Sequence, residues 1–158
     1  MSEQSRPAVG GCMCGAVRYE AIGEPLEVGH CHCHSCRRIT GAPVVTWVMF
    51  DASKVHFTGR ERSIYKSSPG VERAFCSQCG TPLTFEGRSR AWERPIIEIY
   101  ISTFDNPENF VPDRHWFHVE RIDWFDVADG LPRYRGVGMK DEEPYRYGPA
   151  TEGPQAGT

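Results

Sequence analysis

Hydrophobic residues recur along the chain with the two-residue period of half-buried β-strands. The segment GAVRYEA (15–21) places Val17, Tyr19 and Ala21 on one face and charged residues on the other. Because no stretch of about 12 residues shows a sustained helical apolar stripe, we predict an all-β, mainly antiparallel domain. The other predicted strands are short runs rich in β-branched and aromatic residues, each bounded by turn residues: PVVTWVMF (43–50), KVHF (54–57), RSIYKS (62–67), ERAF (72–75), PLTF (82–85) and PIIEIYI (95–101).

The two ends of the chain lack this pattern. Residues 1–8 are polar, and residues 137–158 are rich in Gly, Pro and Glu without periodicity. We therefore predict a flexible N-terminus over 1–8, one domain over 9–136, and a C-terminal tail over 137–158 that is mobile or draped over the surface. Within the domain, a helical turn is predicted at DNPENF (105–110), with Pro107 in its first position.

Several large or titratable side chains are assigned to the interior or to the surface by their pattern. Glu98 alternates with Ile97 and Ile99, which predicts an exposed position on the polar face of a strand. His115 and His118 are expected to be buried, hydrogen-bonded structural residues rather than catalytic ones. The aromatic residues expected in the core are Trp47, Phe50, Phe75, Phe85, Tyr100, Trp116, Phe117 and Trp124.

Composition and charge exclude several classes of protein. The chain has 158 residues, enough for one domain with a core. Its 18 Lys and Arg against 21 Asp and Glu give a net charge of −3, whereas nucleic-acid binders are usually basic. The run PVVTWVMF (43–50) is too short to cross a bilayer, and MSEQSRPAVGG (1–11) lacks the apolar core of a secretory signal. We therefore expect a cytoplasmic protein without nucleic-acid or membrane partners.

All seven cysteines fall into clusters, which is a strong sign of metal binding. In a reducing compartment, clustered thiols favour metal or catalysis over disulfides, and thiolates select zinc among the common ions. The cysteine clusters are Cys12-x-Cys14, Cys31-x-Cys33-x2-Cys36 and Cys76-x2-Cys79.

The first and third clusters together make a closed set of four ligands. Cys76 and Cys79 lie on a tight turn that Gly80 permits, and such a zinc knuckle needs two more ligands. Cys12 and Cys14 supply two, on one face of an extended segment. Four thiolates in a closed shell are typical of structural zinc. We call these residues the four-cysteine group.

The remaining thiols form a three-cysteine group: Cys31, Cys33 and Cys36. In an extended segment, His30, His32 and His34 point away from the thiols. This alternation favours an open fourth position, as in catalytic zinc sites, over a histidine as fourth ligand or a reduced trio without metal. Three thiolates leave zinc with a net charge of about −1, which suits a thiol ligand better than water activation.

Two arginines directly follow the three-cysteine group. Arg37 and Arg38 are candidates for offsetting its negative charge and for binding the carboxylate of a thiol substrate. The alternative for each is a place on a solvated face, where such residues usually lie.

Four segments resemble the family of glutathione-dependent formaldehyde-activating enzymes, which includes the centromere protein V group. The resemblance covers residues 10–135 and implies a small zinc-stabilised β-tent domain, with a structural zinc in the four-cysteine group and a catalytic-type zinc in the three-cysteine group. It also implies the family's activity, a carbon–sulfur lyase reaction that joins glutathione to formaldehyde as S-hydroxymethylglutathione. The segments are GGCMCGAVRYEA (10–21), HCHCHSCRRITGAP (30–43), FCSQCGTPLTF (75–85) and STFDNPENFVPDRHWFHVERIDWFDVADGLPRY (102–134).

Three hypotheses for function follow. The first is a carbon–sulfur lyase-type enzyme with two Zn²⁺ per chain, acting on a small thiol, such as glutathione, and an aldehyde, such as formaldehyde. The second is a non-catalytic, zinc-stabilised binding or scaffold module, and the third is redox sensing by the three-cysteine group. The intact three-cysteine group favours the enzyme, and a tail that is not basic disfavours a chromatin-type role.

Overall fold

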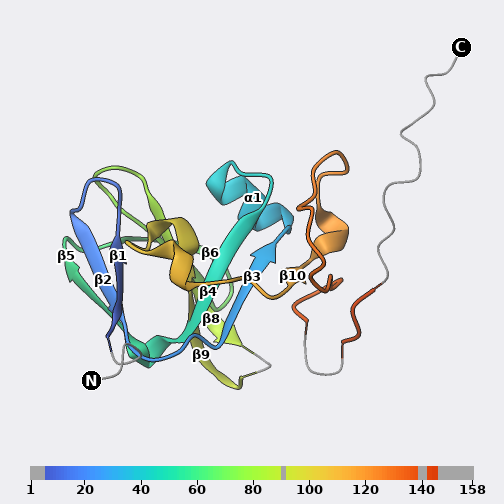
Figure 1. The fold of residues 1–158 in the computed structure, drawn as a ribbon. Helices are drawn as coiled ribbons and strands as arrows, with labels where there is room; N and C mark the ends of the chain where they lie inside the picture. Colours follow the sequence, from blue (N-terminus) through green and yellow to red (C-terminus); the bar gives the residue numbers. More distant parts are fainter. Residues whose placement is uncertain (1–5, 90–91, 139–141, 146–158) are drawn as a thin grey trace, which may run out of the picture.

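The computed structural model describes residues 6–89, 92–138 and 142–145 and shows a mostly β fold with a short α-helix (Figure 1). The helix, α1, spans His34–Thr40. Single 3₁₀ turns are η2 (Ala52–Lys54), η3 (Ile101–Thr103), η4 (Pro107–Asn109) and η5 (His118–Glu120). The strands are β1 (Ala8–Gly11), β2 (Val17–Ala21), β3 (Glu27–Cys31), β4 (Val45–Asp51), β5 (Val55–Gly59), β6 (Ser63–Ser68), β7 (Val71–Phe75), β8 (Pro82–Ser89), β9 (Arg94–Tyr100) and β10 (His115–Trp116).

The strands form two sheets, a three-stranded one in the order β1-β2-β5 and a seven-stranded one in the order β10-β3-β4-β9-β8-β7-β6. Figure 1 shows the smaller sheet at one side of the larger one. Neighbouring strands are antiparallel except for β10, which runs parallel to β3. The predicted mainly antiparallel β architecture is therefore confirmed, and each strand predicted from alternation is present.

The two faces of the larger sheet bury different sets of side chains. On one face, Val48 and Phe50 of β4 pack in the main core together with Ile97 and Ile99 of β9. On the other face, Trp47 of β4 packs in a second buried cluster that contains Tyr100, Cys31 and Cys36. Because alternate residues of a strand point to opposite faces, the three-cysteine group lies across the sheet from the main core.

The sequence pattern predicts neither the helix α1 nor the strands β1, β3 and β10. For the segment of the three-cysteine group, alternation predicts an extended chain with a turn, whereas the chain forms a helix from His34. Cys36 is the buried residue of α1, so the helix has no apolar stripe that periodicity could detect. Gly41 ends the helix with φ +69°, a left-handed conformation that favours glycine. The predicted turn with Pro107 in its first position is confirmed as η4.

The aromatic residues expected in the core are buried or partly buried, with one exception. Trp47, Phe50, Tyr100 and Trp116 are at most 6% exposed. The prediction is wrong for Trp124, which is 81% exposed. Trp124 lies in an irregular segment after η5, where no strand alternation directs a side chain inward.

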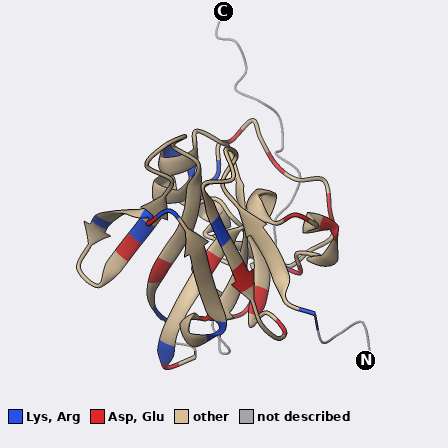
Figure 2. Cartoon of the chain, turned by 90° about the vertical axis from the view of Figure 1, so that its left-hand side faces the viewer, with Lys and Arg blue, Asp and Glu red and all other residues tan. Residues whose placement is uncertain are grey.

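Charged residues of both signs are interspersed over the strands in the view of Figure 2, and no basic stripe stands out there. No helix in the described ranges is long and apolar enough to cross a bilayer. Of the predicted flexible segments, residues 1–5, 139–141 and 146–158 lie outside the described residues. In the described part of the tail, the Tyr145 backbone nitrogen donates to the Arg133 carbonyl oxygen at 3.0 Å.

Candidate functional site

Two loops bring the four-cysteine group together. Cys12 and Cys14 lie between β1 and β2, and Cys76 and Cys79 lie between β7 and β8. The sulfur atoms of Cys12 and Cys14 are 3.5 Å apart, and those of Cys14 and Cys76 are 3.9 Å apart. All four sulfur atoms lie within 4.8 Å of one another, which is consistent with metal binding.

Backbone contacts hold these loops in place. Gly80 has φ +74°, and its nitrogen donates to the Cys76 carbonyl oxygen at 2.9 Å, which closes the turn predicted as a knuckle. Thr81 links the two loops, because its Oγ1 accepts from the Met13 nitrogen at 3.1 Å. Hydrogen bonds from Thr81 lower the pKa of the Cys79 thiol to about 5. The turn therefore favours the thiolate form of Cys79, which is the form that binds metal.

The three-cysteine group lies where β3 ends and α1 begins. Cys31 is the last residue of β3, Cys33 is the N-cap of α1, and Cys36 lies in the first turn of the helix. Cys31 and Cys36 are each 5% exposed, whereas Cys33 is only partly buried. The three sulfur atoms lie within 4.8 Å of one another, a spacing that is also consistent with metal binding.

The histidines around these thiols point elsewhere, as the alternation predicts. His30 Nδ1 lies 2.9 Å from Thr46 Oγ1, and His34 Nδ1 lies 3.1 Å from the Glu120 carboxylate. His32 is directed toward another histidine, described below. Among the residues that the structure describes, no histidine or carboxylate joins the three thiols as a fourth ligand.

The three thiols differ in their acidity. Hydrogen bonds from Cys31 and Cys36, aided by the backbone nitrogens of Cys36 and Ser35, lower the pKa of Cys33 well below its ordinary value. Hydrogen bonding to Cys33 raises the pKa of Cys31, and burial adds to this effect. The arrangement therefore concentrates negative charge on Cys33, the more exposed of the three thiols.

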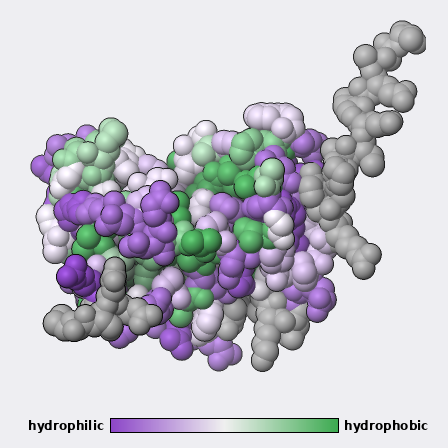
Figure 3. All heavy atoms as spheres, in the orientation of Figure 1, coloured by the Kyte–Doolittle hydropathy of each residue, from purple (hydrophilic) through white to green (hydrophobic). Residues whose placement is uncertain are grey.

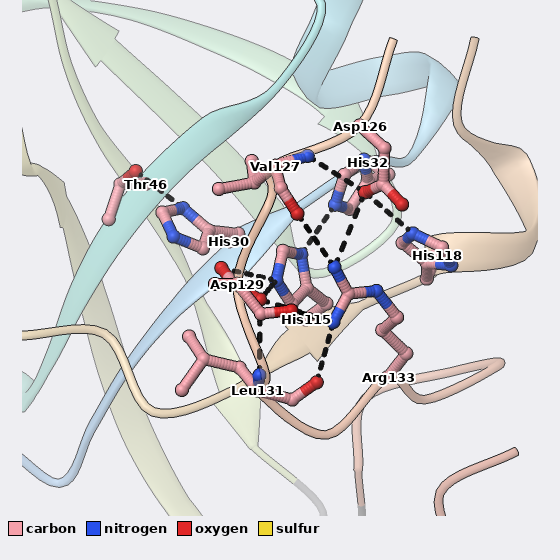
Figure 4. Close-up of polar contacts among 10 residues, drawn as sticks. All are labelled: His30, His32, Thr46, His115, His118, Asp126, Val127, Asp129, Leu131 and Arg133. Atoms are coloured by element: carbon pink, nitrogen blue, oxygen red, sulfur yellow. Dashed lines mark hydrogen bonds and ion pairs between the residues drawn. The ribbon is translucent and has the colours of Figure 1, made fainter. Parts of the chain in front are cut away.

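A polar network supports the strand that carries Cys31. His115 Nδ1 lies 2.8 Å from His32 Nε2, and His115 Nε2 lies 3.1 Å from both carboxylate oxygens of Asp129 (Figure 4). Because a carboxylate accepts, His115 donates to Asp129 from Nε2, and its Nδ1 accepts from His32. The network thereby fixes the ring of His32, which lies between Cys31 and Cys33 in the sequence.

The network also contains two overlapping sets of side chains with the spacing of metal ligands: His30–His115–Asp129 and His32–His115–Asp126. The Arg133 guanidinium lies 3.1 Å from Asp129 and 3.6 Å from Asp126, so a cation already balances both carboxylates. His115 and His118 are 0% exposed and hydrogen-bonded to Asp129 and Asp126, which confirms the prediction for both histidines. These contacts make the network a structural support of the site.

The two arginines proposed as substrate contacts have different surroundings. Arg37 donates from Nε to the His32 carbonyl oxygen at 2.9 Å and from Nη2 to the Glu120 carbonyl oxygen at 2.8 Å. Arg38 is exposed, and both side chains line a shallow hollow that also contains Trp124. Arg37 thus joins α1 to the neighbouring loop, and a substrate role for either arginine stays a prediction.

The sequence does not identify Arg73, Glu98 or Tyr100 as residues of the site. Arg73 of β7 pairs with Phe85 of β8, which pairs with Glu98 of β9, so the three side chains share one face of the sheet. Tyr100 lies two residues after Glu98 on the same face. Alternation correctly separates Glu98 from Ile97 and Ile99. That face, however, is covered rather than open to solvent.

Burial changes the state of Glu98. It raises the pKa of the Glu98 carboxyl to about 8, against the opposing effect of the Arg73 charge. The only sequence signal for the cluster is the alternation in PIIEIYI, which places Glu98 and Tyr100 on one face.

Comparisons with known proteins identify related sequences. The sequence model of the glutathione-dependent formaldehyde-activating enzymes matches residues 7–120. A protein of Halomonas elongata, provisionally named as such an enzyme, is 31% identical over 144 residues, covering 84% of this chain and 88% of its own. An uncharacterized lyase of Schizosaccharomyces pombe is 33% identical over 78 residues, covering 48% of this chain and 55% of that protein. The chain therefore belongs to the family of glutathione-dependent formaldehyde-activating enzymes.

Proposed function

We propose that the protein is a zinc-dependent enzyme of the carbon–sulfur lyase class. Its substrates are a small thiol, such as glutathione, and an aldehyde, such as formaldehyde. The observation that carries the proposal is the three-cysteine group, whose thiols converge without a fourth ligand among the described residues. Catalytic zinc sites keep such a position for water or substrate.

The thiol spacing of the four-cysteine group fits a structural zinc. With Zn–S bonds near 2.3 Å, tetrahedral geometry separates the sulfur atoms by about 3.8 Å. The separations of 3.5 Å for Cys12–Cys14 and 3.9 Å for Cys14–Cys76 are close to this value. A zinc there ties the loop after β1 to the loop after β7 and stabilises a β-tent domain with two zinc ions per chain.

In the proposed reaction, the thiol sulfur attacks the carbonyl carbon of the aldehyde. A C–S bond forms, the C=O double bond becomes a single bond, and the proton of the thiol ends on the oxygen. The product is an S-hydroxymethyl thioether when the aldehyde is formaldehyde, and the reverse direction is the C–S bond cleavage after which the lyase class is named. A zinc ion held by Cys31, Cys33 and Cys36 would supply a positive centre that favours the thiolate form of the substrate thiol.

Residues of this chain provide the surroundings that the reaction needs. Cys31, Cys33 and Cys36 hold the metal, and Cys33 is the ligand most open to solvent. Trp47 and Trp116 pack in the same buried cluster as Cys31 and Cys36 and exclude water from one side. Electrostatic interactions strengthen where water is excluded.

The reaction can be followed by exchange NMR with ¹³C-formaldehyde and glutathione. We expect zinc-loaded protein to accelerate the interconversion of free formaldehyde and the S-hydroxymethyl adduct above its rate in buffer. The Cys33→Ser variant should remain folded and give the rate of buffer alone. If the zinc-loaded wild type leaves the exchange rate unchanged, the binding-module hypothesis replaces the enzyme.

A further inference from the structure

A cavity of about 290 Å³ lies between α1 and the strands β7, β8 and β9. Ile39 of α1 forms one wall, and Phe75 of β7 and Pro82 of β8 form others. The side chains of Arg73 and Tyr100 also line it. Its volume is close to the lower end for small-ligand sites, roughly 300 Å³, so it fits a small molecule or one end of a larger one.

Arg73 brings a buried positive charge to this cavity. Its side chain is only 7% exposed, and its Nη1 atom is buried without a hydrogen-bond partner. Within the described ranges, no carboxylate oxygen lies within 4.0 Å of its guanidinium. A buried guanidinium without an anion is costly, because arginine stays charged in proteins. The position therefore offers a positive charge and a free donor atom to an anionic ligand.

Tyr100 adds a second unused donor. It is 6% exposed, and its hydroxyl oxygen is buried without a hydrogen-bond partner. Its ring lies against Trp47, with the ring centroids 3.9 Å apart, so that packing fixes its direction. A tyrosine hydroxyl is protonated at neutral pH and is able to donate a hydrogen bond.

The cavity is next to the thiols. Tyr100 packs in one buried cluster with Cys31 and Cys36, and Ile39 follows Cys36 by one turn of α1. A ligand whose sulfur reaches the three-cysteine group can therefore place its other end near Arg73.

Figure 3 shows hydrophobic surface in the region of α1 at the top of the view. The walls of the cavity are apolar at Ile39, Phe75 and Pro82. Such walls suit methylene groups. The guanidinium and hydroxyl donors at Arg73 and Tyr100 suit the two oxygens of a carboxylate.

We propose that Arg73 and Tyr100 form a subsite for the carboxylate of the thiol substrate, which makes short-chain thiol carboxylates the preferred substrate class. This proposal rests on the proposed function, because it assumes that the sulfur binds at the three-cysteine group. It assigns substrate recognition to the covered face of the sheet rather than to Arg38 on the exposed surface of α1.

The test compares 3-mercaptopropionate with 3-mercaptopropionamide, which share a carbon skeleton and differ in charge. Isothermal titration of the zinc-loaded wild type should show the acid binding roughly 10- to 100-fold more tightly than the amide, as expected for a charge-assisted hydrogen bond. Arg73→Met should remove this preference and leave the affinity for the amide within about twofold. Tyr100→Phe should reduce the preference, and the surface control Arg38→Met should retain it.

If Arg73 had only a structural role, Arg73→Met would weaken the binding of the acid and of the amide alike. Because the substitution removes a buried charge without an ion-pair partner, we expect a melting temperature equal to or above that of the wild type. If the acid and the amide bind the wild type equally, or if Arg73→Met weakens both alike, the carboxylate subsite is wrong while the thiol function stands.

Propionate separates the two proposals when neither thiol binds. If neither thiol binds, the proposed function is contradicted. The subsite is then tested with propionate alone, whose binding is followed through the methyl NMR signals of Ile39. A shift of these signals in the wild type that is absent in Arg73→Met supports the subsite. Equal spectra with and without propionate overturn it.

Discussion

The Sγ atom of Cys33 accepts a hydrogen bond from the backbone nitrogen of Cys36 at 3.3 Å, so one thiol of the three-cysteine group caps the helix that carries another. The cap satisfies a backbone donor of the first turn of α1, which otherwise has no partner within the helix. The Cys33 side chain therefore contributes both to the three-cysteine group and to the start of α1.

Replacement of Cys33 separates its two roles. Serine is a preferred N-cap and preserves the hydrogen bond, whereas alanine loses it. Both variants lose the thiolate, so both should release metal from the three-cysteine group. We expect Cys33→Ala to unfold with a free energy about 1 kcal/mol lower than that of Cys33→Ser in urea titrations. Equal stability of the two variants would show that the cap does not matter.

Loss of one ligand from the four-cysteine group should be far more damaging. Structural zinc contributes folding free energy of about 10 kcal/mol or more in small domains, comparable to the whole stability of a typical protein. Cys79→Ser should therefore unfold or aggregate, as measured by circular dichroism and size exclusion, while Cys33→Ser stays folded. A soluble Cys79→Ser variant with an unchanged melting temperature contradicts the structural assignment.

The two groups should also differ in how they release metal. Three protein ligands hold zinc less firmly than four, so mild chelation should empty the three-cysteine group first. Elemental analysis should then show about one zinc per chain, with the circular dichroism spectrum unchanged. Simultaneous loss of both ions together with unfolding is the opposite result, and it would remove the distinction between the groups.

The buried histidines predict instability at mildly acidic pH. Burial lowers the pKa of His115 and His118 below the ordinary value near 6.5, although Asp129 and Asp126 act against this shift. As pH falls, the unfolded chain therefore takes up protons before the folded one. The contribution of these two histidines to the free energy of unfolding is therefore full above about pH 6.5. It decreases as the pH falls through 6.5 toward the lower pKa values of the two rings in the folded protein.

Melting temperatures between about pH 8 and pH 5 check this expectation, with the zinc content measured at each pH to separate thiol protonation. His118→Gln removes one titrating ring, so its melting temperature should fall less steeply over the same range. A wild type whose melting temperature is constant from about pH 7.5 to 5.5 would exclude a role for these histidines in acid instability.

Much of the site follows from local sequence rules, because its ligands are close in sequence. The spacing of Cys31, Cys33 and Cys36 predicts a common site, and alternation directs His30 and His32 away from it. Strand alternation likewise predicts β2 and β9. These features depend on near neighbours along the chain, which a single sequence displays directly.

The residues that line the cavity do not follow from such rules. Arg73 and Tyr100 are 27 positions apart and meet only because β8 lies between β7 and β9 in the sheet. Glu98 has the alternation of an exposed residue, yet its face of the sheet is covered. The helix α1 buries Cys36 without an apolar stripe, so periodicity does not reveal the element that covers this face.

The central claim is that a substrate thiol completes the ligand set of the three-cysteine group. Cobalt substituted for zinc reports this directly, because each added thiolate strengthens the sulfur-to-metal charge-transfer absorption. Glutathione should increase this absorption in the wild type, and S-methylglutathione, which lacks an ionisable sulfur, should not. The Cys33→Ser variant should show no response while remaining folded. If no thiol changes the spectrum of the fully loaded wild type, the account of the site as a thiol-binding metal centre is wrong.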